Sequence, residues 1–162
     1  MRICVISDTH IPDRYEGLPA QLVSEIKKSD LVIHAGDFTS FDLYQQIKHL
    51  KPLKAVLGNM DASELRKHLK EKETFNVKNF KIGVMHGYGK PEKIMETVKE
   101  NFNNSFDLII FGHSHTPYQE TSGRTVYLNP GSPTDKIFTP YNTFGIVEIN
   151  AELHARIERM EP

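Results

Sequence analysis

Five short apolar segments of the chain each end in a glycine or serine, with polar residues close behind. In chain order they read ICVIS, LVIHAG, LKAVLG, KIGVMHG and LIIFG. Continuous apolar runs of this length are typical of strands that are buried on both faces, as in a parallel sheet. Because such strands must be covered on both sides, they restrict the chain to folds in which other elements pack over a buried sheet.

The segments between these runs have the spacing of amphipathic helices. The helices are expected at residues 18–29, 41–50, 62–72 and 91–102. After Gly112 the apolar spacing changes toward two, with Gly and Pro between the segments, which predicts antiparallel strands near residues 118–122, 124–131, 143–149 and 152–160. We therefore predict an α/β fold in which two packed sheets carry helices on their outer faces. The length of 162 residues fits one domain over residues 1–162.

Composition excludes several classes of protein. The formal net charge is −1, and the sequence contains no basic run with interleaved aromatic residues. Nucleic-acid binding is therefore not expected. No apolar run approaches the roughly 18 residues that a membrane span needs. The single cysteine, Cys4, lies in an apolar strand, so we expect a core thiol and a cytoplasmic protein. The sequence leaves a monomer and a homo-oligomer, either dimer or tetramer, as alternatives.

Metal-ligating side chains follow all five apolar runs. In open α/β sheets, ligands gather at the carboxyl ends of the strands, so these side chains are expected at one edge. In an extended segment, residues i and i+2 project to the same side, so D-x-H and H-x-H should each direct two ligands one way. The candidate ligands are Asp8, His10, Asp37, Asn59, His86, His113 and His115.

Seven ligands are too many for one tetrahedral ion, but they suit two divalent ions about 3.5 to 4 Å apart. Asp37, a carboxylate that stands alone after a central strand, is the expected bridge. We assign one ion to Asp8, His10, Asp37 and His115, and the other to Asp37, Asn59, His86 and His113. Mixed imidazole, carboxylate and amide ligands favour manganese, iron, cobalt, nickel or zinc over calcium.

The charge of such a site predicts its substrate. Two divalent ions and two aspartates leave a net charge of about +2, which attracts a phosphate oxyanion. A water that bridges the ions has a lowered pKa and becomes a nucleophile for attack on phosphorus. Phosphoester hydrolysis is therefore the expected reaction, and no organic cofactor is expected.

The motif series resembles that of the calcineurin-like metallophosphoesterases. Their D-x-H, GD, GN, H and GH-x-H elements stand here in order as DTH from Asp8, GD at Asp37, GN at Asn59, HG at His86 and GHSH at His113. The short length and the NPGSP segment make the chain similar to small phosphodiesterases of the YfcE/MJ0936 type, which also resemble the retromer subunit Vps29. The resemblance implies a four-layer αββα sandwich of two mixed sheets, the metallo-dependent phosphatase fold. It also implies a dinuclear site, most often manganese, with magnesium, nickel, zinc, iron or cobalt as alternatives.

One position departs from many members of that family. They have G-N-H, where the histidine helps to protonate the leaving group, but this chain has Met60 there. A thioether cannot donate a proton at neutral pH, so the acid role passes to water or to Asp61. We assign catalytic roles to Asn59, Asp61 and His86, and expect aryl or nucleotide diesters to be cleaved far faster than simple alkyl esters.

Two functions of different class follow from these residues. The first is a phosphoric diester hydrolase that uses a metal-bridging hydroxide to cleave a small or nucleotide-like phosphodiester. The second is a Vps29-like scaffold for protein interactions that retains metal sites but turns over weakly. All seven ligand positions carry competent side chains, which favours the enzyme.

Outside this set, His34 is expected to be a hydrogen-bonded residue of the sheet. The NPGS segment at residues 129–132 is either a simple turn or a support of the site.

Overall fold

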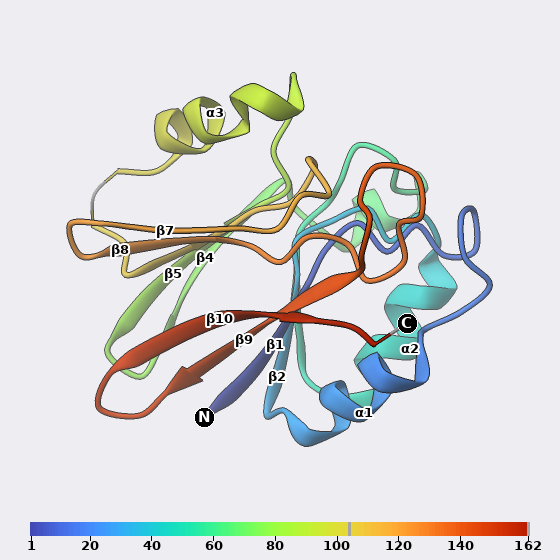
Figure 1. The fold of residues 1–162 in the computed structure, drawn as a ribbon, viewed down its shortest axis with the longest axis horizontal. Helices are drawn as coiled ribbons and strands as arrows, with labels where there is room; N and C mark the ends of the chain where they lie inside the picture. The colour runs from blue at the N-terminus through green and yellow to red at the C-terminus, as the bar shows by residue number, and fades with distance from the viewer. Residues whose placement is uncertain (104, 162) are drawn as a thin grey trace.

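The computed structural model describes residues 1–103 and 105–161 as two five-stranded β-sheets with helices on their outer faces (Figure 1). The first sheet has the order β10-β9-β1-β2-β3, and its strands are β1 (Arg2–Ile6), β2 (Leu31–His34), β3 (Leu53–Ala55), β9 (Thr143–Ile149) and β10 (Leu153–Arg159). The second has the order β4-β5-β6-β8-β7, and its strands are β4 (Lys72–Val77), β5 (Phe80–Met85), β6 (Leu108–Ile110), β7 (Tyr118–Ser122) and β8 (Thr125–Asn129).

Both sheets are mixed. In the first, β1, β2 and β3 run parallel, whereas β9 and β10 are antiparallel additions at the β1 side. In the second, β5, β6 and β8 run parallel, whereas β4 and β7 are antiparallel edge strands. The helices are α1 (Ala20–Lys28), α2 (Phe41–Leu50) and α3 (Ile94–Asn101), with short 3-10 helices η1 (Leu65–Lys67) and η2 (Pro91–Lys93).

Three apolar clusters separate four layers, and alternate residues of β1 show how the sequence divides between them. Cys4 and Ile6 pack with α1 and α2 on the outer face of the first sheet. Ile3 and Val5 point the other way, into a cluster that joins the two sheets. A third cluster fixes α3 to the outer face of the second sheet. The layers in Figure 1 therefore follow helices, sheet, sheet and helix, which confirms the predicted αββα sandwich.

The predicted helix over residues 62–72 is wrong. The structure has only the three-residue helix η1 there, followed by β4, which the sequence analysis did not identify. The amide of Leu57 donates to the Lys70 carbonyl and Val56 forms a bridge with Lys70, so the backbone near Lys70 pairs with the continuation of β3. These hydrogen bonds leave the chain extended and deliver it to the edge of the second sheet.

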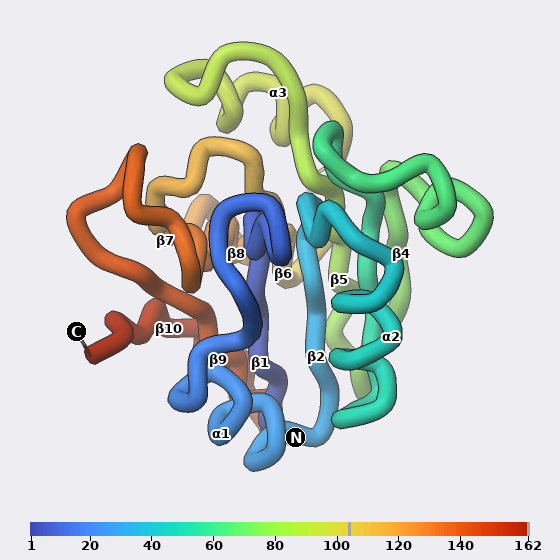
Figure 2. Tube along the Cα trace, turned by 90° about the vertical axis from the view of Figure 1, so that its right-hand side faces the viewer, coloured from blue at the N-terminus to red at the C-terminus, as the bar shows by residue number. Residues whose placement is uncertain are grey.

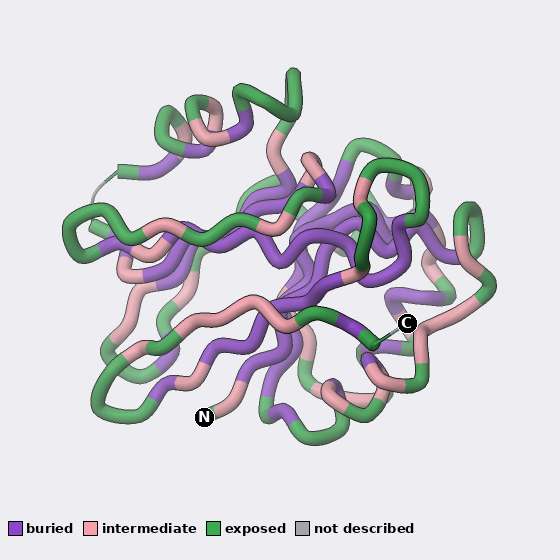
Figure 3. Tube along the Cα trace, in the orientation of Figure 1, coloured by how far each residue is buried: buried purple, intermediate pink, exposed green. Residues whose placement is uncertain are grey.

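The loops that leave the parallel strands gather at one edge of the two sheets. Figure 2 shows that the chain leaves β1 and β2 at the same end, where the turn after β5 also lies. Much of the backbone at this edge is buried although it is not in a strand (Figure 3). In the part of the chain that the structure describes, none of the helices is long and apolar enough to span a bilayer.

The contact between α3 and the second sheet requires glycine at position 83 of β5, because any larger residue would crowd Phe102. A Cβ at this position would lie 2.6 Å from Cε1 of Phe102, which is itself buried. We expect Gly83→Ala to lower the free energy of unfolding by about 1–3 kcal/mol, because the added methyl overpacks this interface. Urea denaturation measures the change. Gly17→Ala, at a position with no described heavy atom within 4 Å of the new Cβ, is the control and should change stability by less than half as much. Equal losses of stability in the two variants would show that the contact with Phe102 does not require glycine at position 83.

Candidate metal centre

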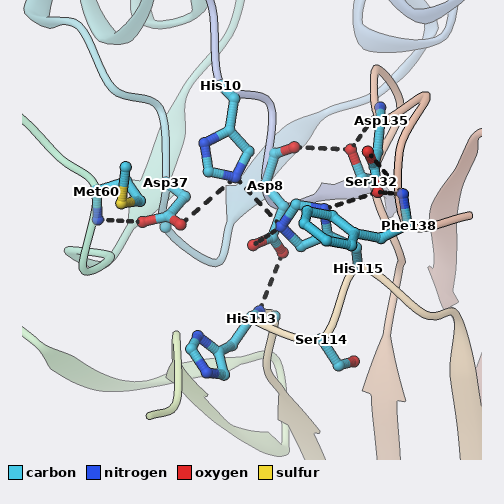
Figure 4. A network of polar contacts seen from close by, with 12 residues as sticks. Asp8, His10, Asp37, Met60, His113, Ser114, His115, Ser132, Asp135 and Phe138 are labelled. Atoms are coloured by element: carbon cyan, nitrogen blue, oxygen red, sulfur yellow. Dashed lines mark hydrogen bonds and ion pairs between the residues drawn. The ribbon is translucent and has the colours of Figure 1, made fainter. Parts of the chain in front are cut away.

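The structure brings all seven predicted ligands to the shared edge of the two sheets. Five of the side chains are buried, whereas Asn59 is exposed and His113 is half-buried. The ligands come from the loops after β1, β2, β3, β5 and β6, so both sheets contribute. Figure 4 shows the side chains of Asp8, His10, Asp37 and His115 close together, with the backbone nitrogen of His113 next to Asp8.

One compact group contains Asp8, His10 and His115. One ligand atom from each lies within 4.8 Å of the others. Nε2 of His115 is 3.4 Å from Oδ1 of Asp8 and 3.2 Å from Nε2 of His10. Asp8 and His10 belong to one loop, and His115 lies 105 residues after His10, so the packing of the two sheets brings them together.

A second compact group contains Asp8, Asp37 and His86. Oδ2 of Asp37 lies 3.4 Å from Nε2 of His86 and 3.5 Å from Nε2 of His10, so it faces both groups. Its other oxygen, Oδ1, accepts a hydrogen bond of 2.8 Å from the backbone amide of Met60. This bond orients the carboxylate and leaves Oδ2 between the two groups. Oδ1 of Asp8 also lies near both groups, 3.8 Å from Nε2 of His86 and 3.4 Å from Nε2 of His115.

Asn59 and His113 continue the second group toward solvent. Oδ1 of Asn59 is 3.1 Å from Nε2 of His86 and 3.2 Å from Nδ1 of His113. The H-x-H pair therefore divides, because His115 lies with the first group and His113 lies beside Asn59. The predicted division of seven ligands between two ions stays a prediction, and these positions are compatible with it.

Hydrogen bonds to the far nitrogens fix which ring atom is presented by three of the four histidines in the predicted ligand set. A carbonyl or carboxylate oxygen only accepts, so the ring nitrogen facing it must carry the proton. Nδ1 of His86 donates to the Ala35 carbonyl at 2.7 Å, and Nδ1 of His115 donates to Oδ2 of Asp135 at 2.9 Å. With the proton on Nδ1, the neutral form of either ring presents its Nε2 lone pair. His113 is reversed, because its Nε2 donates to the Gly89 carbonyl at 2.8 Å and leaves Nδ1 toward Asn59.

The donor set fits divalent ions. Ligand atoms at about 2.0–2.2 Å from one ion lie roughly 3–3.5 Å apart, and most of the nitrogen–oxygen separations above are close to that range. Oδ1 of Asp8 and Nδ1 of His10 are buried with no hydrogen-bond partner among the described residues. A buried carboxylate oxygen without a donor is costly unless a cation compensates it. Asp8, Asp37 and the histidines around them could supply that cation's ligands.

The backbone around these ligands is unusual. A positive φ is uncommon outside glycine, yet Asp8, His10, Asp37, His113 and His115 have φ between 46° and 71°. The expectation of extended D-x-H and H-x-H segments is therefore wrong. The left-handed conformation at both ends of each motif turns the side chains inward instead. Such strain persists only where the surrounding structure holds it, and it concentrates at functional sites.

Two glycines make this close packing feasible. A Cβ at Gly58 would collide with the backbone nitrogen and Oδ1 of Asp37, and a Cβ at Gly112 would collide with Ser7 and approach Oδ2 of Asp8 to 2.7 Å. Glycine at these two strand ends therefore permits a close approach of the backbone that a side chain would block. The two loops can then touch the ligand-bearing loops directly.

Asp61, for which a catalytic role was predicted, joins two of these loops. Its carboxylate accepts hydrogen bonds from the amides of Gly58 at 2.7 Å, Thr39 at 2.9 Å and Asp37 at 3.2 Å. Burial raises the pKa of Asp61, although the backbone donors oppose this change. The side chain thereby ties the loop after β2 to the loop after β3.

The NPGS segment supports the site, and Asp135, three residues after Ser132, was not identified from the sequence. Oγ of Ser132 donates to the Asp8 carbonyl at 2.7 Å. Asp135 accepts from His115 and from the amides of Ile137 and Phe138, and these donors outweigh burial and lower its pKa. The sequence signal was the polar run SPTD after an apolar strand. Its pairing with a histidine 20 residues earlier depends on the fold.

His34 occupies the position expected of a structural histidine. It is fully buried, its Nε2 lies 3.0 Å from Oγ1 of Thr9, and its Nδ1 accepts from the amide of Gly36 at 3.1 Å. Burial holds the pKa of His34 well below its usual value, so the ring is neutral.

The carboxylates around His86 affect its protonation. Burial opposes the charged ring, but Asp8 and Asp37 outweigh burial and raise the pKa of His86 to about 9 in the metal-free protein. A metal ion must then displace this proton, because only the neutral ring is a ligand.

We expect the dissociation constant for Mn²⁺ to increase by roughly 100-fold from pH 8 to pH 6. The release of one proton when the ion binds changes this constant about tenfold for each pH unit. Competition with a chelator measures it. His154→Ala, at an exposed histidine, should show the same slope, and a flat profile would contradict the assignment.

Comparisons with known proteins agree with this geometry. Residues 1–152 match the family model described as the calcineurin-like phosphoesterase superfamily domain. A probable metallophosphoesterase of Methanocaldococcus jannaschii is 40% identical over 139 residues, which is 83% of this chain and 69% of that protein. A phosphodiesterase of the same organism is 24% identical over 171 residues, covering 97% and 98% of the two chains.

Among solved structures, wild-type Vps29 of Entamoeba histolytica complexed with Zn²⁺ is similar to this chain with a TM-score of 0.75. The two are 27% identical, and the similarity covers 99% of this chain and 98% of that one. The family model spans most of the residues, and the ligands occupy the loops where its motif series was identified. The chain belongs to the calcineurin-like phosphoesterase superfamily.

Proposed function

We propose that the chain is a metal-dependent phosphodiesterase that hydrolyses a small or nucleotide-like phosphodiester at a pair of divalent ions. The observation that carries the proposal is the arrangement of two buried ligand groups that share Asp8, with Oδ2 of Asp37 facing both. The relative named as a phosphodiesterase, similar over nearly its whole length, supports the diester specificity.

Two divalent ions, manganese foremost, supply a water of lowered pKa as the nucleophile and positive charge for the phosphate oxygens when they are bound. The protein's part is to orient the ligands. Asp135 and the Ala35 carbonyl hold the rings of His115 and His86 by their Nδ1 protons. Outer hydrogen bonds of this kind typically change metal affinity or activity by about 10- to 100-fold when they are removed.

The surroundings of the ligands suit a substrate with flat, apolar arms. Phe138 is 64% exposed, and its ring centroid lies 5.3 Å from that of His115 (Figure 4). Tyr88 and Met60, each within two residues of a predicted ligand, are also exposed. Aromatic and thioether side chains beside a phosphate-binding centre favour aryl or nucleobase groups, which bury apolar area against them.

Protonation of the leaving group is the weak step of this site. Met60 has no proton to donate, and the carboxylate of Asp61 is already occupied by three backbone amides. We therefore assign Asp61 to holding the loops and leave the proton to water. The enzyme then depends on leaving groups that are stable as anions.

A scaffold for protein interactions is the alternative function. The similarity to Vps29 and the exposed apolar residues Ile137 and Phe138 favour it. All seven ligand side chains are present, and hydrogen bonds orient the far nitrogens of His86, His113 and His115, which favours the enzyme. Turnover therefore distinguishes the two.

The first test is the hydrolysis of bis(p-nitrophenyl) phosphate and of p-nitrophenyl phosphate with Mn²⁺, Ni²⁺, Zn²⁺ or Mg²⁺. We expect metal-dependent release of p-nitrophenol, with the diester preferred. Asp37→Ala should lose more than the roughly 10- to 100-fold that an outer hydrogen bond costs, because a carboxylate oxygen that faces both ligand groups is removed. Asp13→Ala, at an exposed aspartate of the loop after β1, is the matched control and should retain activity.

Each outcome of this test has a distinct meaning. If no metal produces turnover above that of Asp37→Ala, the scaffold function is favoured. If the monoester is strongly preferred, the proposed substrate class is wrong, although metal binding would stand.

The second test concerns Met60 and uses methyl aryl phosphates whose phenols differ in pKa. Because no side chain protonates the leaving group, we expect kcat to fall steeply as the pKa of the phenol rises. Met60→His should flatten this dependence and accelerate the poorest substrates, toward the roughly 100- to 10,000-fold that a general acid can contribute. Met60→Gln, of similar size but without an acidic proton, is the control. A shallow dependence in the unaltered protein would show that another acid is present.

A further inference from the structure

A cavity of about 310 Å³ lies beside the exposed part of the metal centre. Asn59 and His86 form the wall that it shares with the predicted ligands, and Leu57 and Met85 provide apolar surface. Its volume is at the lower end of the range for ligand pockets, which is enough for a single substrate arm of about nucleotide size. The remaining wall carries two cations, from Arg66 and Lys72.

The register of the second sheet places Lys72 next to the metal centre. Lys72 is the first residue of β4 and pairs with Met85, the residue before His86. Its Nζ donates to the backbone carbonyl of Asn101 at 3.0 Å and lies 5.2 Å from the ring centroid of Phe102. These contacts hold the ammonium group in place. An ammonium has three N–H donors, so two remain for a ligand.

Arg66, on η1, also lines the cavity. The buried side chain of Leu65 anchors this short helix in the core, and the exposed Arg66 follows it directly. Within residues 1–103 and 105–161, no carboxylate lies within ion-pair distance of its guanidinium group. The next residue, Lys67, belongs to the same helix but does not line the cavity.

We propose that Arg66 and Lys72 form a subsite for a second phosphate group, carried as a monoester on one arm of the diester substrate. The two cations match the dianion, and a guanidinium can bind two of its oxygens at once. Glu71, also on the wall, opposes one positive charge and leaves a net charge of about +1 at the subsite. Tyr88, whose hydroxyl accepts from Nδ2 of Asn101, stands at the same wall as a surface for the base or sugar. This inference rests on the proposed function and specifies its substrate.

The test uses two diesters with the same leaving group, the p-nitrophenyl esters of thymidine 5′-phosphate with and without a 3′-phosphate. We expect the additional phosphate to raise kcat/KM by roughly tenfold or more, the contribution of a charge-assisted hydrogen bond. Arg66→Ala and Lys72→Ala should each bring the ratio of the two substrates close to one and leave the simpler ester almost unchanged. Glu71→Gln should raise the ratio, because it removes the opposing charge.

Lys67→Ala and Lys70→Ala are the matched controls, since each removes one positive charge from the same segment outside this cavity. Both should retain the wild-type ratio. A ratio near one in the unaltered protein, or an equal loss in the control variants, would overturn the subsite. If neither ester is hydrolysed with any metal, the proposed function fails, which is a different result from hydrolysis of both esters at equal rates.

Discussion

Two buried carboxylates, Asp8 and Asp37, lie among buried imidazoles, and their negative charge must be compensated for the fold to be stable. Asp8 is fully buried, and its Oδ1 has no hydrogen-bond donor in the described part of the chain. Isolated charges are expensive to bury, and in the metal-free protein the protonated ring of His86 offsets part of this cost. Divalent cations resolve the same conflict more completely, because they accept the lone pairs of both carboxylates and imidazoles. The site is thus costly as a structural core and well suited to hold metal.

The rest of the fold keeps these groups in place. Each ligand loop leaves a parallel strand whose last residue is buried, so the core fixes the starting point of the loop. Left-handed backbone at Asp8, His10 and His115 is held by contacts from other loops, including the hydroxyl of Ser132 on the Asp8 carbonyl. The residues that we propose to contact the substrate, by contrast, lie in exposed loops and at the sheet edge. The predicted metal ligands are thus placed by the core, whereas the proposed substrate contacts lie on loops, where functional residues are common.

Sequence patterns predicted the layered fold and the set of candidate ligands, because both depend on local signals. Buried strands appear as apolar runs, and polar residues after them mark one edge of the sheets. The helix expected over residues 62–72 was wrong, since backbone pairing between Lys70 and the Val56–Leu57 segment overrides its local preference. Asp135 was missed because its contact with His115 is set by tertiary packing. The left-handed turns were missed for a related reason, since crowding around the site imposes them.

The central claim is that this edge of the sheets binds a pair of divalent ions. Anomalous diffraction from crystals grown with Mn²⁺, recorded on both sides of the manganese edge, tests it without reference to any substrate. The claim predicts two anomalous peaks about 3.5 to 4 Å apart, with Oδ2 of Asp37 between them. Crystals saturated with Mn²⁺ that show no anomalous peak beside Asp8 and Asp37, with the imidazoles still clustered, would contradict it.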